Sequence, residues 1–205
     1  MKAIVFFSLV ALLLWMIMFS SWTAPYINFW FMMALSVSFL ALSALLLQRK
    51  KLAENYRFKI SYLPIGVVSA FILYMVFLAG NFAAVKLFAF ARGQISGIYD
   101  LADQSNPIIV GVLIFFLIGP GEEIFWRGFI QKGLAERYGA LKGYLLAAAV
   151  YTLIHIWAFN FILLGAALVC SLFWGFIYMK YRSVWPGIIS HALWDLAILV
   201  LLPIR

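Results

Sequence analysis

The sequence predicts an all-α membrane protein, a polytopic bundle of about seven transmembrane helices. Of its 205 residues, 67% are hydrophobic and only 11% are charged, a composition that excludes an ordinary soluble domain. Apolar runs of about 20 residues, long enough to cross a bilayer, recur along the whole chain. We therefore expect a single domain over residues 1–205, integral to the membrane and surrounded by bilayer lipid.

The predicted spans follow one another with short connections. The first apolar run, residues 1–19, is longer than the core of a signal peptide and no clean cleavage site follows it, so we expect it to remain as a span. The other six spans are expected at about residues 27–47, 63–88, 107–130, 143–157, 159–179 and 184–202. Residues 92–106 are polar and glycine-containing, which predicts an aqueous loop. Residues 132–142 are expected to form a short basic connection.

The lysines and arginines alternate between the connections as the positive-inside rule requires. With a cytoplasmic N-terminus, eleven basic residues fall on the cytoplasmic side and three on the other side. The eleven are Lys2, Arg49, Lys50, Lys51, Arg57, Lys59, Lys132, Arg137, Lys142, Lys180 and Arg182, and the three are Lys86, Arg92 and Arg205. This distribution predicts a cytoplasmic N-terminus. It also explains the net charge of +8 without nucleic acid, which would need a basic face on a soluble fold.

Six ionisable side chains remain at membrane depth once the connections are assigned. They are Glu122, Glu123 and Arg127 in the fourth span, His155 in the fifth, and His191 and Asp195 in the seventh. Each such side chain costs roughly 2.5–3.5 kcal/mol to insert, so a group of this size predicts a functional site.

The spacing of these residues separates their roles. Glu123 and Arg127 are four residues apart and can pair on one helix face, whereas Glu122 points about 100° away. One glutamate is thus expected in a structural ion pair, and the other is left for chemistry. His191 and Asp195 also share a face, so the carboxylate can orient the imidazole.

Three helices could bring a carboxylate and two imidazoles to one point, as a general base with its supporting groups. Tyr151, one turn before His155, is expected to flank the same cavity. A lone intramembrane histidine is otherwise a helix–helix hydrogen-bonding residue. Cys170, the only cysteine, is expected to be a packing residue. The segment Gly119-Pro120-Gly121 either exposes backbone amides to a water-filled cavity or merely kinks the span.

Three motifs carry a resemblance to a known family. Glu122-Glu123-x-x-x-Arg127, Tyr151-x-x-x-His155 and His191-x-x-x-Asp195, in this order on successive apolar helices, resemble the CaaX-protease and bacteriocin-processing family (CPBP, Abi) of intramembrane proteases. That family includes the Ras-converting prenyl-protein endopeptidases. The resemblance covers about residues 108–198, and we place the motif-bearing core at residues 107–202.

The resemblance implies that Glu122 and His155 activate a water molecule for attack on a peptide carbonyl. It also implies that His191 and Asp195 stabilise the oxyanion or hold the site, with Glu123, Arg127 and Tyr151 in support. Two positions depart from the family pattern. Tyr151 replaces the usual phenylalanine, and Asp195 replaces the asparagine typical of the prenyl-protein enzymes. A carboxylate cannot donate to an oxyanion unless it is protonated, so Asp195 is expected to orient His191.

The resemblance leaves the metal question open, because family members are described both as metalloproteases and as metal-free enzymes. Glu122, His155 and His191 could form a three-ligand zinc site with an open position. The sequence lacks the His-Glu-x-x-His pair that sets two zinc ligands one turn apart. We therefore favour a glutamate mechanism without a cofactor.

The expected substrate is a protein or peptide cut near its C-terminus or near the membrane, and sorting-tail processing by the same family is an alternative. A second alternative is a proton-coupled carrier that uses the same residues as a relay. Rhomboid and presenilin chemistry are excluded, because no Gly-x-Ser-x-Gly occurs and Tyr99-Asp100 lacks its Gly-x-Gly-Asp partner. The short chain favours a bacterial or archaeal cell membrane. Residue counts favour a site that opens toward the cytoplasm.

Overall fold

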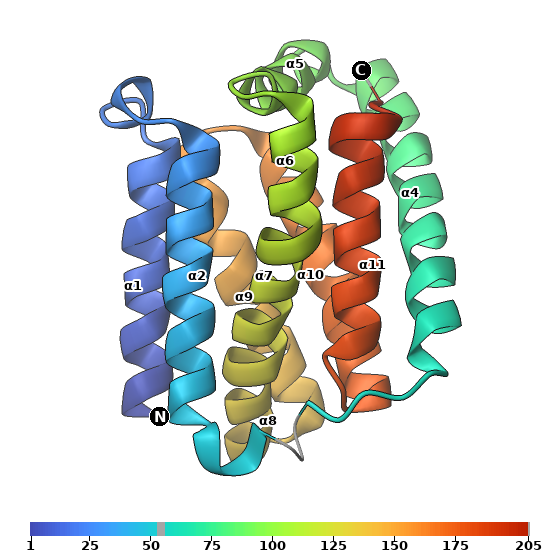
Figure 1. The fold of residues 1–205 in the computed structure, drawn as a ribbon. Coiled ribbons are helices and arrows are strands. Elements are labelled where there is room, and N and C mark those ends of the chain that lie inside the picture. Colours follow the sequence, from blue (N-terminus) through green and yellow to red (C-terminus); the bar gives the residue numbers. More distant parts are fainter. Residues whose placement is uncertain (53–55, 205) are drawn as a thin grey trace.

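The computed structural model is a bundle of long helices that lie side by side (Figure 1). It describes residues 1–52 and 56–204, and the side chain of Lys51 is also outside the described part. Among the described residues, six helices are long and apolar enough to cross a membrane, and Trp185–Leu201 forms a shorter apolar helix. The predicted polytopic all-α bundle is therefore confirmed.

Each predicted span corresponds to a helix or to a series of helical segments. The first half of the chain forms α1 (Lys2–Phe19), η1 (Ala24–Tyr26), α2 (Phe29–Leu47), η2 (Arg49–Lys51), α4 (Tyr62–Leu87) and α5 (Ala91–Ala102). The fourth span comprises α6 (Pro107–Leu113), η3 (Ile114–Ile118), α7 (Gly119–Glu123), η4 (Ile124–Gln131) and α8 (Lys132–Tyr138). The remainder forms α9 (Ala140–Ile154), η5 (His155–Ala158), α10 (Phe161–Tyr181), α11 (Trp185–Leu196) and η6 (Ala197–Leu201).

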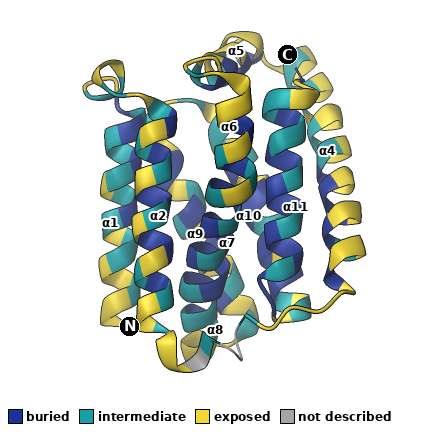
Figure 2. Ribbon diagram, viewed as in Figure 1, coloured by how far each residue is buried: buried dark blue, intermediate teal, exposed yellow. Residues whose placement is uncertain are grey.

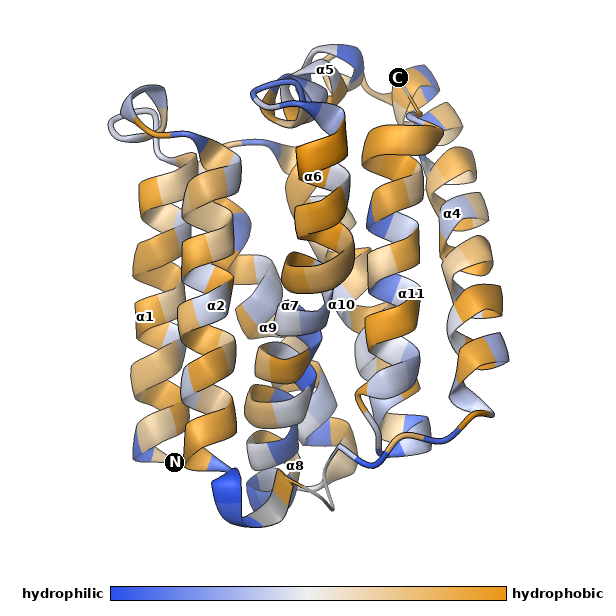
Figure 3. Ribbon diagram, viewed as in Figure 1, coloured by the Kyte–Doolittle hydropathy of each residue, from blue (hydrophilic) through white to orange (hydrophobic). Residues whose placement is uncertain are grey.

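The outer faces of the bundle are apolar and exposed. On α1, for example, the side chains of Phe6, Leu9 and Leu13 are more than half exposed. Exposed and apolar residues coincide along the length of the outer helices (Figures 2 and 3). A continuous apolar surface of this kind suits lipid rather than water, because every helix already satisfies its own backbone hydrogen bonds.

Asparagine side chains cap three of the helices. The side-chain oxygens of Asn28, Asn106 and Asn160 accept hydrogen bonds from backbone amides in the first turns of α2, α6 and α10. A cap satisfies a backbone donor that has no partner within the helix. These helices all begin at the end of the bundle opposite the N-terminus (Figure 1), so the polar caps gather at that end.

The loop predicted for residues 92–106 is largely a helix. α5 is amphipathic: Ala91, Ile95, Tyr99 and Ala102 are buried, and Arg92 lies on the exposed face. This spacing of three and four residues is the helical period, which packs one face onto the bundle and leaves the other for solvent. α5 therefore covers the end of the bundle where α4 ends and α6 begins (Figure 1).

The fourth span is longer and less regular than predicted. It continues beyond Ile130 to Tyr138, so the expected basic connection is mostly the helix α8. Gly139 then turns the chain with a φ of 87°, a conformation that favours glycine. Two π-helical segments, η3 and η4, flank the α-helical segment α7.

The glycines of α7 serve close packing rather than an open backbone. A Cβ at Gly119 would lie 3.1 Å from the backbone of Ala192 on α11. A Cβ at Gly121 would lie 2.3 Å from the side chain of Val37 on α2. The double-glutamate segment is therefore held between α2 and α11, and Pro120 lies in the first turn of α7.

The basic connections lie at one end of the bundle. The N-terminus, the link between α2 and α4, the turn after α8 and the turn before α11 all lie opposite α5 (Figure 1). This arrangement is the one that the alternation of charges requires. Arg205 and the side chain of Lys51 are outside the described residues. The direction in which the bundle sits in a membrane, and its description as one domain, stay predictions.

Candidate active site

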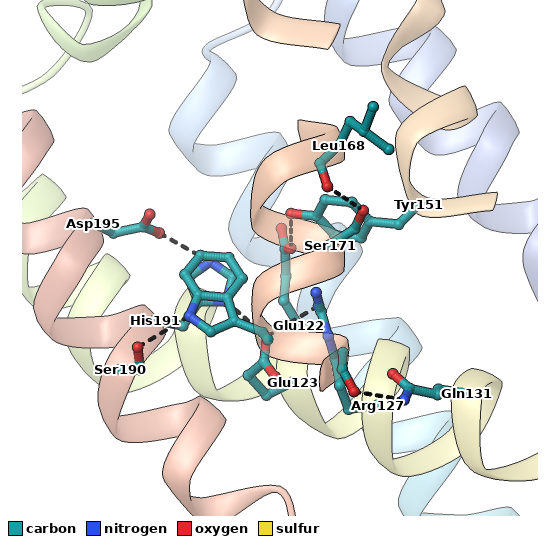
Figure 4. A network of polar contacts seen from close by, with 12 residues as sticks. Glu122, Glu123, Arg127, Gln131, Tyr151, Leu168, Ser171, Ser190, His191 and Asp195 are labelled. Carbon is teal, nitrogen blue, oxygen red and sulfur yellow. Dashed lines mark hydrogen bonds and ion pairs between the residues drawn. The ribbon is translucent and has the colours of Figure 1, made fainter. Parts of the chain in front are cut away.

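Glu122 lies in α7, near the middle of the fourth span. Its side chain is buried, and its Oε2 accepts a hydrogen bond of 2.9 Å from the hydroxyl of Tyr151 on α9 (Figure 4). Glu122 also lines the main cavity of the bundle. Its carboxylate is therefore both held by a neighbouring span and open to a ligand in that cavity.

Glu123 points into the interface between helices. Its Oε1 lies 3.0 Å from Nη1 of Arg127, so the expected ion pair is formed between two buried side chains. The same oxygen lies 3.0 Å from Nδ1 of His191 on α11 (Figure 4). A Cβ at Gly187 would lie 2.5 Å from Oε2 of Glu123, so the glycine gives this carboxylate its room.

His191 lies between two carboxylates. Its Nδ1 faces Glu123, and its Nε2 lies 3.3 Å from Oδ2 of Asp195, as the spacing of four residues predicted. A doubly protonated imidazole can donate to both. The ring stacks on the indole of Trp174 at 3.7 Å between centroids, and that indole donates a hydrogen bond to Ser190 Oγ. The ring is therefore held by three neighbouring groups: two carboxylates and the indole.

His155 begins η5, at the end of the fifth span. Its Nδ1 bonds to the backbone carbonyl of Tyr151 at 2.8 Å, and its Nε2 accepts a hydrogen bond of 3.2 Å from the indole of Trp15 on α1. The indole can only donate, so the described tautomer carries its proton on Nδ1. Both nitrogens of His155 are therefore engaged in this arrangement.

A cavity of about 550 Å³ joins most of these groups. Its polar wall includes Glu122, Tyr151, His155, His191 and Asp195, whereas the rest of its lining is mostly apolar and comes from α1, α2, α4, α5 and α10. The lining includes residues of α5, of the end of α4 and of the starts of α2 and α10. The cavity therefore extends away from the basic connections and toward α5, and its expected opening toward the cytoplasm stays a prediction.

Glu122, His155 and His191, the alternative zinc ligands, do not fit a zinc ion as they are placed. Among the described residues, no three His, Cys, Asp or Glu side chains are grouped so that they could hold a metal ion. The donor chemistry explains this: both nitrogens of His155 and both nitrogens of His191 already face other groups. A zinc ligand needs a free imidazole nitrogen.

Sequence reasoning missed the residues that hold the two histidines. Trp15 and Trp174 look like core aromatics in apolar runs, and no local pattern indicates that either contacts a histidine. Trp15 is 140 positions from its partner along the chain. Cys170, predicted to be a packing residue, is buried as expected, and it also lines the cavity.

Residues 104–197 match the family described as type II CAAX prenyl endopeptidase Rce1-like. All three polar motifs lie inside this range. No curated protein and no solved structure matches the chain.

Proposed function

Because residues 104–197 match the type II CAAX prenyl endopeptidase Rce1-like family, we propose that this chain is an intramembrane endopeptidase. The family resemblance predicted from the three motifs is thereby confirmed. We further propose that Glu122 is the general base that activates the attacking water. The observation that carries this proposal is the separation of the two glutamates: Glu123 is bound by Arg127 and His191, whereas Glu122 lines the cavity.

Peptide hydrolysis at this site starts with a water molecule beside the Glu122 carboxylate. Glu122 takes a proton as the water oxygen attacks the carbonyl carbon, and the carbonyl oxygen becomes an oxyanion. Glu122 then gives the proton to the leaving nitrogen as the C–N bond breaks. General base catalysis of this kind requires a carboxylate that is positioned but not consumed by an ion pair, which is the condition that Glu122 meets.

The other polar residues fix the positions of the side chains around Glu122. Arg127, Glu123, His191 and Asp195 form a continuous chain of charged contacts across α11 and the fourth span. Such a chain fixes positions before reaction, and preorganised groups stabilise developing charge without rearranging. His155 forms the adjacent wall of the cavity. We propose that it assists Glu122 with water only after the indole of Trp15 has released its Nε2.

The proposed substrate is a protein or peptide cut near its C-terminus or near the membrane. The mostly apolar cavity supports a membrane-anchored substrate, because an apolar segment leaves lipid for this space without meeting unpaired polar groups. The family description names prenylated CAAX sequences, so a prenylated CAAX peptide is the first substrate to test. Processing of a C-terminal sorting tail remains the second candidate within the same chemistry.

The test is Glu122→Gln in purified protein, with a prenylated, fluorescence-quenched CAAX peptide and a panel of sorting-tail peptides. Glutamine keeps the shape of the side chain and still accepts from Tyr151, but it cannot act as the base. We expect cleavage to fall by at least about 100-fold. Glu136→Gln is the control, because Glu136 is an exposed partner of Lys132 on α8 and should keep full activity.

Each outcome of this test separates the proposed protease from one of its alternatives. A carrier would retain substrate binding in Glu122→Gln and would show no cleavage in either protein. Unchanged cleavage by Glu122→Gln would exclude Glu122 as the base. Cleavage of sorting-tail peptides alone would leave the mechanism intact and change the substrate class.

We also propose that the reaction needs no metal, which the engaged nitrogens of the two histidines support. Elemental analysis of active protein should therefore find far less than one zinc ion per chain. Treatment with a strong zinc chelator should leave the cleavage rate within about twofold. Stoichiometric zinc that is lost together with activity, and restored with it, would overturn the proposal.

A further inference from the structure

The proposed hydrolysis needs a hydrogen-bond donor for the oxyanion, and the residues around the cavity allow its identity to be inferred. The oxyanion carries a full negative charge in a site without bulk water. A hydrogen-bond donor directed at it therefore raises the reaction rate by a large factor. Glu122 and Asp195 are acceptors when ionised. The donor must come from another side chain of the lining or from a backbone amide.

Most donors in the lining are already committed. The indole of Trp15 donates to His155, that of Trp30 to backbone carbonyls of α5, and that of Trp174 to Ser190. Both nitrogens of His191 face carboxylates. The hydroxyl of Tyr99 donates to the carbonyl of Ile198. Releasing any of these groups would leave a buried partner unsatisfied, which costs about 1–3 kcal/mol.

Four side-chain donors of the described lining are not held by a group outside the proposed reaction: the hydroxyl of Tyr151, which donates to Glu122, the indole N–H of Trp194, the amide of Asn81 and the weakly donating thiol of Cys170. The nitrogen of Trp194 is fully buried without a hydrogen-bond partner, and its ring packs between Phe77 and Trp174. Asn81 lies on α4, a helix that packs mainly against α11 rather than against α7. The Tyr151 hydroxyl alone is in contact with the proposed base.

We propose that Tyr151 is a catalytic residue, the donor that stabilises the oxyanion; this inference rests on the proposed function. In the resting site its hydroxyl donates to Oε2 of Glu122 at 2.9 Å. When Glu122 takes the proton of the attacking water, it loses its charge and becomes a weaker acceptor. The O–H of Tyr151 then turns to the neighbouring carbonyl oxygen, on which negative charge has appeared.

Protons and electrons balance in this series of reaction steps. The water oxygen forms a bond to the carbonyl carbon, and the carbonyl π pair moves onto oxygen. The water proton resides on Glu122 until the C–N bond breaks, and it then passes to the leaving nitrogen. Tyr151 keeps its own proton throughout and returns its hydrogen bond to the regenerated carboxylate.

The surroundings of Tyr151 suit this role. Its ring is held edge-to-face against Trp126, with 5.3 Å between centroids. The guanidinium of Arg127 lies over the ring, 5.0 Å from its centroid. A packed ring keeps the hydroxyl oxygen in place while its proton rotates. The nearby positive charge favours the negative charge that develops beside the hydroxyl.

The decisive experiment compares Tyr151→Phe with Tyr144→Phe. Phenylalanine preserves the ring contacts and removes only the hydroxyl. We expect kcat for the prenylated CAAX peptide to fall about 100- to 1,000-fold, with KM within about threefold. Tyr144 is the matched control: it lies on the same helix, its hydroxyl donates to the carbonyl of Leu172, and it does not line the cavity.

A peptide phosphinate, which carries a tetrahedral anionic centre, separates an oxyanion donor from a residue that merely positions Glu122. Its inhibition constant for Tyr151→Phe should rise by about the factor by which kcat/KM falls, because both measure the same lost donor. Binding of an uncleavable amide peptide should not change. A fall in kcat with unchanged phosphinate inhibition would reduce Tyr151 to a positioning residue and overturn the inference.

Two further variants keep this failure apart from failure of the proposed function. If Glu122→Gln abolishes cleavage while Tyr151→Phe remains fully active, the protease stands and the inference is wrong. If Trp194→Phe or Asn81→Ala, rather than Tyr151→Phe, loses both kcat and phosphinate binding, the donor is that residue. If Glu122→Gln cleaves normally, the proposed function itself fails.

Discussion

Two adjacent glutamates have different environments because one residue step around a helix changes the neighbours completely. Glu122 meets the hydroxyl of Tyr151 and the cavity. Glu123 meets Arg127 and His191 in a dry interface, where its exposed fraction is 0%. The spacing of four residues predicted both the contact of Glu123 with Arg127 and that of His191 with Asp195. The contact between Glu123 and His191 could not be predicted, because it joins two helices.

Glu123→Gln should destabilise the protein rather than only slow it. Arg127 would keep its charge in a buried site and lose the carboxylate that neutralises it, which typically costs about 3–5 kcal/mol. Thermal unfolding in detergent should show a clearly lowered Tm and a lower yield of folded protein. Glu136→Gln, which disrupts an exposed ion pair with Lys132, should leave the Tm nearly unchanged. A normal Tm for Glu123→Gln would contradict a structural role for that residue.

At the scale of helices, the length of the apolar runs predicted the spans, whereas the polarity of residues 92–106 led to a wrong prediction of a loop. The seven predicted spans are all helical because only a helix can satisfy its backbone in lipid. The glycines and charges of residues 92–106 suggested a loop, yet Ala91, Ile95, Tyr99 and Ala102 recur at the helical period and α5 forms. Amphipathic spacing therefore carried more information than composition in this segment.

The irregular helix geometry could not have been predicted. Nothing in the apolar run from Ile114 to Ile118, or from Ile124 to Gln131, distinguishes a π-helical from an α-helical hydrogen-bond pattern. π-helical turns are rare and are frequent at functional sites. Their position on both sides of α7 coincides with the tight packing of Gly119 and Gly121 against α11 and α2.

At the scale of the whole molecule, the basic connections lie at one end of the bundle and the cavity extends toward the other end. The basic connections gather at the end of the bundle that carries the N-terminus (Figure 3), whereas the cavity extends toward α5. With a cytoplasmic N-terminus, as the positive-inside rule predicts, we expect the substrate to enter from the non-cytoplasmic half of the bilayer. Residue counts along the spans instead predicted a cytoplasmic opening, because they give the depth of a side chain but not the direction in which it points.

Single cysteines test this orientation in a Cys170→Ala background. Lys142→Cys lies at the start of α9 and Lys86→Cys at the end of α4, and both native side chains are exposed. In intact cells, a membrane-impermeant maleimide should label the cysteine at position 86 and spare the one at position 142. Permeabilised cells should label both. The opposite pattern in intact cells would place the N-terminus outside the cytoplasm.

The two π-helical segments have a practical consequence for protein engineering along the fourth span. A turn closed by i→i+5 bonds contains more residues than an α-helical turn, so a helical wheel drawn at 100° per residue loses phase from Ile114, where η3 begins, and again from Ile124, where η4 begins. Gln131, for example, is buried and donates to the carbonyl of Gly175 on α10. Grafting this motif onto a straight designed helix would therefore rotate everything downstream, unless the extra residues were removed at the same places.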